Sequence, residues 1–297
     1  MRELARGLQF PEGPVVMPDG SILLVEIRRG TLTRVTTEGK VEIVAQLGGG
    51  PNGAALGPGG KIYVCNNGGF SWDVEDKNGN AMPNWELPKG YTSGSIQMVD
   101  PVSGRFETLY TECKGMPLNG PNDLVFDKQG GMWFSDLGKG RGRMRDYGAV
   151  YYAKSDGSMI KQAIFPLEGP NGVGLSPDGK TLYVAETFTA RLWAYQIVAP
   201  GELKLPGTCL AAPGGHQMFD SLAVDARGFV CVATLLNGGI TAVSPDGRII
   251  NHWPTDDPIT TNIAFGGPGL KTAYVTLSST GRLVAFDWAP GGLKLNY

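Results

Sequence analysis

Six side chains that carry oxygen recur at one position of a repeated phrase in this sequence. In four of the six copies a Pro stands directly before that position, and a short apolar run, a turn and a second β-rich run follow it. We call these six residues the oxygen set: Glu12, Asn52, Asn122, Asn171, Asp220 and Asn262. The set holds two carboxylates and four carboxamides, with no Lys, Arg or His to pair the acids. Hard divalent cations prefer such oxygens, whereas softer metals prefer His or Cys.

A turn is the alternative explanation for any single copy. Asn and Asp are common turn residues, and Gly-Pro-Asn-Gly alone indicates only a turn. Six copies in register, with acids at Glu12 and Asp220 where a turn accepts Asn or Gly equally well, favour a cation site instead. Buried carboxylates are costly unless they are paired or coordinated. We therefore predict one divalent cation, Ca²⁺ by preference, with Zn²⁺, Mg²⁺, Mn²⁺ and Fe²⁺ as alternatives.

The elements that must position the oxygen set are short β-strands. Successive members are 40, 70, 49, 49 and 42 residues apart, and each interval holds several β-rich runs separated by tight turns. About four strands in a period of 40 to 50 residues are typical of a β-propeller. We predict an all-β, six-bladed β-propeller that forms a single domain over residues 1–297. Its first strands line the channel, and a strand within residues 4–10 closes the ring beside residues 282–286.

Bulk composition excludes several classes of partner. The net charge is −2 without a basic cluster, which disfavours nucleic acid and anionic membranes. No apolar run is long enough for a membrane span, and residues 1–9 do not resemble a signal peptide. The four cysteines have no metal-site spacing and are expected to be small buried hydrophobic residues in a reducing compartment. We expect a cytoplasmic protein, monomeric or weakly oligomeric, with a small molecule as its partner.

The interval of 70 residues contains an insertion at about residues 69–94. It is too long for an ordinary turn, and loops of this length are usually functional or disordered. Its two Trp, one Phe and one Met make disorder a poor explanation. We expect an apolar lid over one mouth of the channel, with packing on the side of the propeller as the alternative.

Four motifs in order resemble one known family. Residues 10–14 (FPEGP), 118–123 (LNGPND), 169–172 (GPNG) and 220–225 (DSLAVD) are similar to those of the gluconolactonase, regucalcin (senescence marker protein) and luciferin-regenerating enzyme family. Diisopropyl fluorophosphatase and the paraoxonases are more distant relatives. The resemblance covers nearly the whole chain and implies a six-bladed propeller with one divalent cation in the channel. By motif, the implied ligands are Glu12, Asn122, Asn171 and Asp220, with Asn52 and Asn262 near the ion or the substrate.

The resemblance implies hydrolysis of a lactone. The cation would polarise the ring carbonyl, and Asp220 would be the base that activates water or, alternatively, a direct nucleophile. Glu12 would act mainly as a charge-neutralising ligand. His216 is a candidate proton shuttle, with a loop histidine as the alternative, whereas His252 is expected to be structural. Ser135 and Ser221 lack the sequence context of a serine nucleophile.

The sequence departs from the sugar-lactone members of the family. Gly120 stands where regucalcin-like proteins have an Arg, two residues before Asn122, so one polar substrate contact is missing. Apolar residues near the expected mouth favour a less polar lactone or cyclic ester, although most of them can also be ordinary packing. These residues are Phe70, Trp72, Met82, Trp85, Met116, Phe188, Met218 and Phe219, of which Trp72, Trp85, Met116 and Phe188 are the predicted substrate contacts.

Other functions remain compatible with the same site. A phosphotriester or fluorophosphate could replace the lactone, and another metal-assisted reaction could use the same ligands. From a different class, a propeller that only binds metal or a partner is also possible, because fold does not determine function. The carboxylates Glu12 and Asp220 argue against such a platform, which needs neither in its channel.

Overall fold

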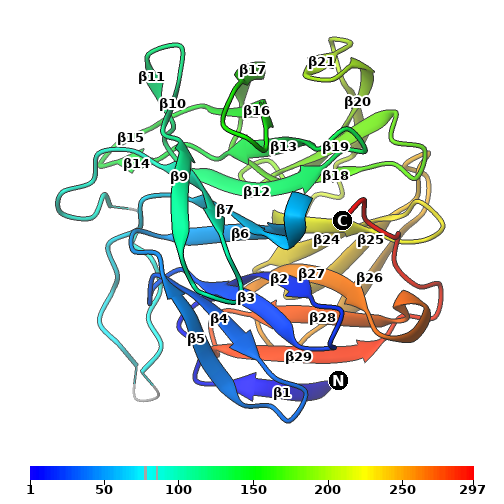
Figure 1. Ribbon diagram of the computed structural model, residues 1–297. Coiled ribbons are helices and arrows are strands. Elements are labelled where there is room, and N and C mark those ends of the chain that lie inside the picture. The colour runs from blue at the N-terminus through cyan, green and yellow to red at the C-terminus, as the bar shows by residue number, and fades with distance from the viewer. Residues whose placement is uncertain (77–78, 85) are drawn as a thin grey trace.

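Each copy of the repeated phrase folds into one antiparallel sheet, and six sheets surround a central channel (Figure 1). The protein is described from a computed structural model, which covers residues 1–76, 79–84 and 86–297. The predicted all-β, six-bladed propeller is therefore confirmed. In the described part of the chain, the helical elements are two single 3₁₀ turns, η1 (Pro58–Gly60) and η2 (Pro268–Leu270), and no helix is long and apolar enough to cross a membrane.

The blades follow one another in sequence order, and each begins with the strand nearest the channel. Blade one contains β2 (Pro11–Val16), β3 (Ile22–Glu26), β4 (Thr31–Val35) and β5 (Val41–Gln46). Blade two contains β6 (Pro51–Leu56), β7 (Ile62–Asn66), β8 (Ser95–Val99) and β9 (Phe106–Tyr110). Blade three contains β12 (Pro121–Phe126), β13 (Gly131–Asp136), β16 (Gly148–Lys154) and β17 (Ile160–Leu167).

The second half of the ring repeats this order. Blade four contains β18 (Pro170–Leu175), β19 (Thr181–Glu186), β20 (Arg191–Ala199), β21 (Glu202–Leu203) and β22 (Thr208–Ala211). Blade five contains β23 (Met218–Val224), β24 (Val230–Leu235), β25 (Gly239–Val243) and β26 (Ile250–Pro254). Blade six contains β27 (Thr260–Gly266), β28 (Thr272–Leu277), β29 (Arg282–Asp287) and β1 (Arg2–Arg6).

The core lies between neighbouring blades, where the apolar faces of two sheets meet. Strands β3, β7 and β13 are buried along their whole length, whereas the outermost strand β26 is exposed throughout. One core cluster joins Tyr63 and Ile96 of blade two to Phe134 and Tyr151 of blade three. Burial on both faces of a sheet explains why the second strands read as unbroken apolar runs. The burial of Cys65 and Cys231 was expected, but Cys209 is exposed, so the expectation for that cysteine is wrong.

The first strand of the chain closes the ring. Strand β1 pairs antiparallel with β29, from Arg2 opposite Ala285 to Arg6 opposite Arg282. The predicted closure beside residues 282–286 is confirmed, but the closing strand begins at Arg2 and ends at Arg6 instead of lying within residues 4–10. The carbonyl oxygen of Pro11 also accepts hydrogen bonds from Thr261 Oγ1 (3.2 Å) and Ser278 Oγ (2.6 Å) of blade six. Closure leaves the last blade without an unpaired edge at β29.

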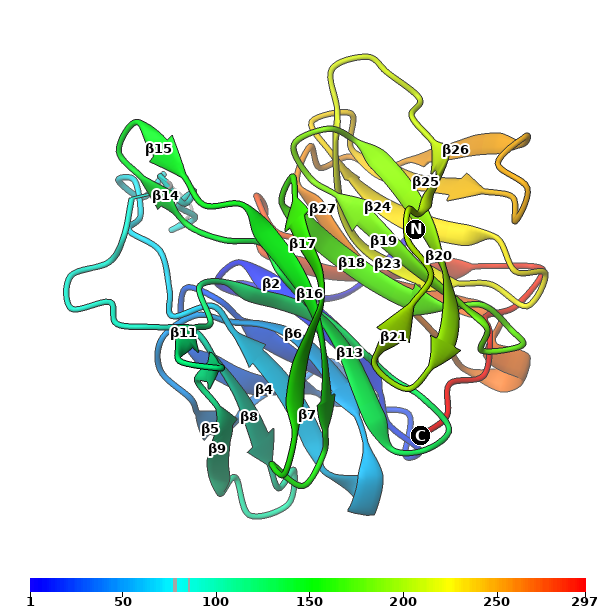
Figure 2. The same cartoon turned by 90° about the horizontal axis from the view of Figure 1, so that it is seen from above.

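The inner strands all begin on one side of the ring, which we call the mouth. The loop that follows the second strand of each blade returns to this side, and in blade two that loop is the insertion, residues 67–94. Both views place the insertion, drawn in cyan, on the same side as the hairpin of β14 (Gly140–Arg141) and β15 (Met144–Arg145) (Figures 1 and 2). A second small hairpin of β10 (Glu112–Cys113) and β11 (Met116–Pro117) precedes blade three.

Candidate active site

A bulge occurs in every inner strand at the position of the oxygen set. In blade three, for example, Pro121 pairs with Asp136 and Leu124 with Phe134, so that the register shifts across Asn122 and Asp123. The shift also spans the member of the oxygen set in blades two, four and five. In blade one it lies directly after Glu12 and in blade six directly before Asn262, and these two residues stay paired in the ladder. A bulge leaves a residue out of the ladder and re-aims its side chain. All six members of the oxygen set are buried, with exposed fractions between 2% and 7%.

Glycines after three members of the oxygen set let neighbouring inner strands touch. A Cβ on Gly53 would lie 2.3 Å from the carbonyl oxygen of Asn122, and one on Gly172 would lie 2.6 Å from the amide nitrogen of Leu222. Gly13 has φ +52° and is equally confined by blade two. Any side chain at these positions would push two blades apart. The glycine in the repeated phrase therefore narrows the channel and holds the oxygen set together.

Glu12 is held in place by blade six. Its Oε2 accepts hydrogen bonds from the backbone of Gly13 (2.6 Å) and from Asn262 Nδ2 (2.7 Å). Asn262 in turn accepts a bond from the backbone of Ile263 at Oδ1 (2.7 Å). Asn262, predicted to lie near the ion or the substrate, thus orients the Glu12 carboxylate.

Asn171 and Asp220 are neighbours across blades four and five. Asn171 Nδ2 donates to Thr187 Oγ1 (3.1 Å), and Asn171 also hydrogen-bonds with Asp220, which partly offsets the rise in the pKa of that carboxyl. Ser135 Oγ donates to the carbonyl oxygen of Asn171, and Ser221 Oγ approaches Asn171 Oδ1 at 3.4 Å. These two serines serve to position Asn171, in agreement with the absence of a serine-nucleophile motif.

Asp123 is a third buried carboxylate that the sequence analysis did not select. It stands where three other blades have glycine, and it accepts hydrogen bonds from the backbone of Leu124 (2.9 Å) and Val173 (3.3 Å). We call Glu12, Asp123 and Asp220 the carboxylate cluster. The motif Asn-Asp in place of Asn-Gly was the available signal.

Burial dominates the electrostatics of the carboxylate cluster. Burial raises the pKa of Asp220 to about 8 and that of Asp123 to about 7. Burial and the neighbouring Asp220 carboxylate also hold the pKa of Glu12 well above its usual range. Asp123 raises the pKa of both other acids, and the opposing hydrogen bonds do not offset these effects. Three acids without a basic partner form a site that favours a cation or protons.

The donors of the oxygen set fit a hard divalent cation. Asn122 Oδ1 is buried and has no hydrogen-bond partner among the described residues, although buried acceptors are normally satisfied. Both donors that hold Glu12 bind its Oε2. Buried carboxylate and carboxamide oxygens match the preference of Ca²⁺. Although the three acids of the carboxylate cluster influence one another, no three His, Cys, Asp or Glu side chains among the described residues are placed to hold one metal ion together, so a cation site here depends on asparagine oxygens.

A second repeated position fixes the turn that leads into the inner strands of blades one to four. Glu26 Oε2 accepts a bond from the backbone of Gln9 (2.6 Å), and Asn66 Oδ1 accepts one from Gly50 (2.9 Å). Corresponding acceptors in blades three and four are Asp136, which binds the backbone of Asn119 and Gly120, and Glu186, which binds that of Glu168. In blades one to three this residue lies 14 positions after the member of the oxygen set, a regularity that sequence inspection could have found.

The predicted apolar contacts occupy different places. Trp72 lies on the insertion with its ring 5.4 Å from that of Phe10, two residues before Glu12. Met116 is 68% exposed on β11 of the β10–β11 hairpin. Phe188 is half-buried, and the guanidinium carbon of Arg145 lies 3.7 Å from the centre of the Phe188 ring. Phe219 is fully buried in the core at the start of β23, which is the ordinary packing given as the alternative for these residues. Trp85 lies outside the described residues.

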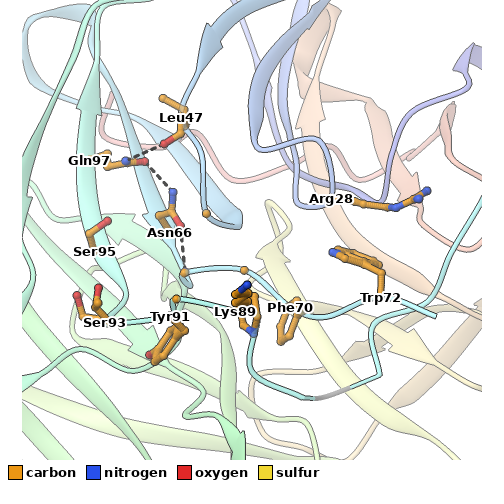
Figure 3. Close-up of a pocket in the computed structure, with 16 residues that line it drawn as sticks. Arg28, Leu47, Asn66, Phe70, Trp72, Lys89, Tyr91, Ser93, Ser95 and Gln97 are labelled. Carbon is orange, nitrogen blue, oxygen red and sulfur yellow. Dashed lines mark hydrogen bonds between the residues drawn. The ribbon is translucent and has the colours of Figure 1, made fainter. Parts of the chain in front are cut away.

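The insertion crosses the mouth side of two other blades. Arg28 of blade one donates to the carbonyl oxygen of Gly79 (2.9 Å) and forms an ion pair with Glu75. Asn80 Oδ1 lies 3.2 Å from the place of a Cβ on Gly281 in blade six. Between the insertion and blade two lies a cavity of about 490 Å³ (Figure 3). Its walls combine Arg28, Asn66 and Gln97 with aromatic rings, so the underside of the insertion is not purely apolar.

Among the described residues, neither histidine is hydrogen-bonded to a member of the carboxylate cluster. His216 is exposed in the loop between β22 and β23, on the mouth side, and its role as a proton shuttle stays a prediction. His252 lies on β26, the outer strand of blade five, and its Nδ1 is 3.0 Å from Thr241 Oγ1 on the neighbouring strand β25. This contact agrees with a structural role.

Comparison with known proteins identifies relatives over nearly the whole chain. The chain is 27% identical to a gluconolactonase of Zymomonas mobilis, over 93% of this chain and 78% of that protein. It is 28% identical to the diisopropyl-fluorophosphatase of Loligo vulgaris, over 66% of this chain and 67% of that one. The structure matches regucalcin of Agrobacterium tumefaciens, a calcium-binding protein, with a TM-score of 0.77 at 19% identity, covering 100% of this chain and 97% of the other.

The match to a known family spans all four motifs of the sequence. Residues 10–279 match the family described as SMP-30/Gluconolactonase/LRE-like region, a span that begins just before Glu12 and ends after Asn262. The motif resemblance and this match point to the same group of propellers. The chain belongs to the SMP-30/gluconolactonase/LRE-like family.

Proposed function

We propose that this protein is a divalent-cation-dependent hydrolase that opens a lactone. The observation that carries the proposal is the buried carboxylate cluster beside the unpartnered Asn122 Oδ1, in a chain whose relative is a gluconolactonase. We assign the cation ligands as Glu12, Asn122, Asn171 and Asp220, and Ca²⁺ as the first candidate. A bound divalent cation would polarise the ring carbonyl and neutralise charge that develops on its oxygen.

Asp220 is the group best suited to move the proton. Its carboxylate is buried beside Asn171, and a carboxylate held in such a position can accept a proton from a reacting water. In the proposed reaction the water oxygen bonds to the acyl carbon while Asp220 accepts a water proton. The ring C–O bond then breaks, and the leaving alkoxide takes the proton from Asp220, which gives an open hydroxy acid. A direct attack by the Asp220 carboxylate is the alternative.

The other residues of the site hold this arrangement in place. Asn262 and Gly13 fix the Glu12 carboxylate, and Thr187 fixes the Asn171 amide. The glycines of the inner strands keep the channel narrow, which limits the water that can enter with the substrate. Preorganised donors and acceptors need no rearrangement during the reaction.

The substrate that we propose is less polar than a sugar lactone. Gly120 offers no side chain to a substrate hydroxyl, and Phe10 and Trp72 form an aromatic edge beside Glu12. A phosphotriester or fluorophosphate is the second candidate, because the chain also resembles a diisopropyl-fluorophosphatase over two thirds of its length.

A substrate panel tests both candidates. Metal-stripped protein with each divalent ion restored is assayed on aldonolactones, alkyl lactones, aryl lactones and a fluorophosphate. We expect turnover of apolar lactones that Asp220→Asn reduces at least a hundredfold, since one general base contributes about 10²–10⁴-fold. Asp246→Asn, the same change in an exposed turn of the same blade, is the matched control. Turnover that survives Asp220→Asn, or fluorophosphate as the preferred substrate, would contradict the proposal.

A further inference from the structure

Lys139 is a buried lysine that the proposed reaction does not use. It lies on the loop between β13 and β14 and is 3% exposed. Its Nζ donates to the carbonyl oxygen of Gly69 (2.7 Å) and to Asn67 Oδ1 (3.2 Å). The ammonium also lies 4.0 Å from the ring centre of Phe70 and 5.4 Å from that of Tyr91. We call these four partners of the ammonium the lysine cage.

Every wall of the lysine cage belongs to the insertion, although the lysine comes from blade three. Asn67, Gly69 and Phe70 form the first root of the insertion, and Tyr91 forms the second root. One side chain therefore bridges two segments that lie more than 20 residues apart in sequence. Carbonyl oxygens and aromatic faces are all electron-rich, so the cage is complementary to a cation and not merely to an alkyl chain. An ammonium needs such compensation when it is removed from water.

The lysine cage is connected to the mouth of the channel. From Phe70 a line of rings continues to Trp72 (6.3 Å) and then to Phe10 (5.4 Å), which stands two residues before Glu12. Tyr91, Phe70 and Trp72 lie in one row along the insertion (Figure 3). The roots also bind the turns that lead into two inner strands. Asn67 N donates to the carbonyl oxygen of Gly50 (2.8 Å), and Tyr91 Oη donates to that of Asn119 (2.5 Å).

We propose that Lys139 is the positioning residue of the channel mouth: its caged ammonium ties both roots of the insertion to blade three and thereby fixes Phe70 and Trp72, whose rings lead to Phe10 just before the first inner strand. The effect on substrate selection rests on the proposed lactone hydrolysis, whereas the cage itself does not. Lys139 acts through the rings of the insertion and touches no reacting atom. Loss of the ammonium would let the insertion open and widen the mouth.

The charge of Lys139 makes this contact sensitive to pH. Burial lowers the pKa of Lys139 to about 7, although the Asp136 carboxylate at the end of β13 opposes that change; Arg141 on β14 adds to it. Asp146 accepts a bond from the Lys139 backbone, and Arg143 and Arg145 are the other charged residues of the loop between β13 and β16. On the insertion, the groups that contact the ammonium are uncharged, and Lys89 is the nearby charge, on the wall of the same cavity. Below pH 7 the ammonium is attracted to the rings. Above pH 7 the neutral amine keeps its hydrogen bonds and loses the cation–π attraction.

Hydrogen exchange of residues 67–94, followed by mass spectrometry, tests the proposal on the whole protein. We expect exchange in this segment to be at least tenfold faster in Lys139→Met, and close to wild type in Lys139→Arg. Lys128→Met, the same change at an exposed lysine of blade three, should leave it unchanged. Unchanged exchange in Lys139→Met would overturn the proposal.

Two further measurements keep the test decisive. If Lys139→Met does not fold, Phe70→Leu removes one face of the cage and leaves the hydrogen bonds of the Lys139 ammonium in place. Hydrogen exchange in residues 67–94 of this variant should be several-fold faster, and exchange at the wild-type rate would also overturn the proposal. After correction for intrinsic exchange, wild-type protein should exchange faster at pH 8 than at pH 6, and Lys139→Arg should not.

Substrate kinetics separate the cage from the reaction. With an active lactone, Lys139→Met should change KM for bulky substrates several-fold and leave kcat within twofold. Faster exchange without any lactone turnover in wild type would support the cage and contradict the proposed hydrolysis. A loss of kcat with exchange unchanged would contradict the positioning role.

Discussion

Cation binding should release protons from the carboxylate cluster. Burial raises the pKa of Asp220 to about 8 in the cation-free protein. At pH 7 about nine-tenths of the Asp220 carboxyls then hold a proton, because the ratio changes tenfold per pH unit. A cation must bind the ionised carboxylate, so this proton is displaced. The raised pKa of Glu12 adds to the release, and we expect roughly one to two protons per cation at pH 7.

The same displacement weakens the affinity at neutral pH. One pKa unit between Asp220 and the solution corresponds to about 1.4 kcal/mol, so affinity at pH 7 should be roughly tenfold below its limit at alkaline pH. Calorimetric titration of metal-stripped protein with Ca²⁺ in two buffers of different ionisation enthalpy counts the protons. Asp220→Asn should release about one proton fewer, and Asp246→Asn should release the wild-type number. Binding heats that do not depend on the buffer would refute the account of the carboxylate cluster.

Three other predictions follow from the same structure. Metal-stripped protein should melt at a lower temperature at pH 7 than at pH 5, because carboxyls with raised pKa values favour the folded state below their unfolded pKa and lose that contribution as pH rises towards 8. Lys139 stays at least half charged in this window, and thermal melts without this fall would show that the cluster is already ionised. Asn262→Ala should weaken cation binding by about 1.5–3 kcal/mol, since a hydrogen bond to the Glu12 carboxylate is lost. An unchanged affinity for the cation in calorimetry would show that Asn262 does not orient Glu12. Gly53→Ala should lower the free energy of unfolding by about 3 kcal/mol, because its Cβ would lie 2.3 Å from a backbone oxygen of blade three. Gly179→Ala, in open space at φ +70°, should lower it by about 1 kcal/mol. Equal denaturation midpoints for the two variants would contradict the close approach of the inner strands.

The repeated phrase was sufficient to predict the architecture and the oxygen set. Six copies fix the number of blades, and an all-β period of this length fits a propeller better than other folds. A closing strand was predictable because an unpaired edge at β29 would be costly, but its bounds were not: residues 4–10 were expected, and residues 2–6 form the strand. Turn residues alone could not reveal the bulges that direct the oxygen set into the channel. The bulges become evident from the shifted register on either side of Asn122.

Other parts of the site depend on contacts distant in sequence. Asp123 was missed because the same position holds glycine in three other blades, where the requirement is space for a neighbouring backbone. Asp136 resembles an ordinary turn residue until its hydrogen bonds to the backbone of Gly120 and Asn119 are known. Lys139 is an isolated charge in a glycine-rich loop, and its four partners come from another blade. The insertion is also tied to blade one by an ion pair between Arg28 and Glu75, which no periodic pattern predicts.

Activity as a function of bound cation tests the central claim most directly. Metal-stripped protein is titrated with Ca²⁺, and hydrolysis of the preferred lactone is measured beside the bound metal at each step. The account predicts no hydrolysis without cation, a linear rise to one equivalent per chain, and no rise in Glu12→Gln or Asp220→Asn at the same total Ca²⁺. Full hydrolysis by the stripped protein, or a rise in either variant that matches wild type, would contradict it.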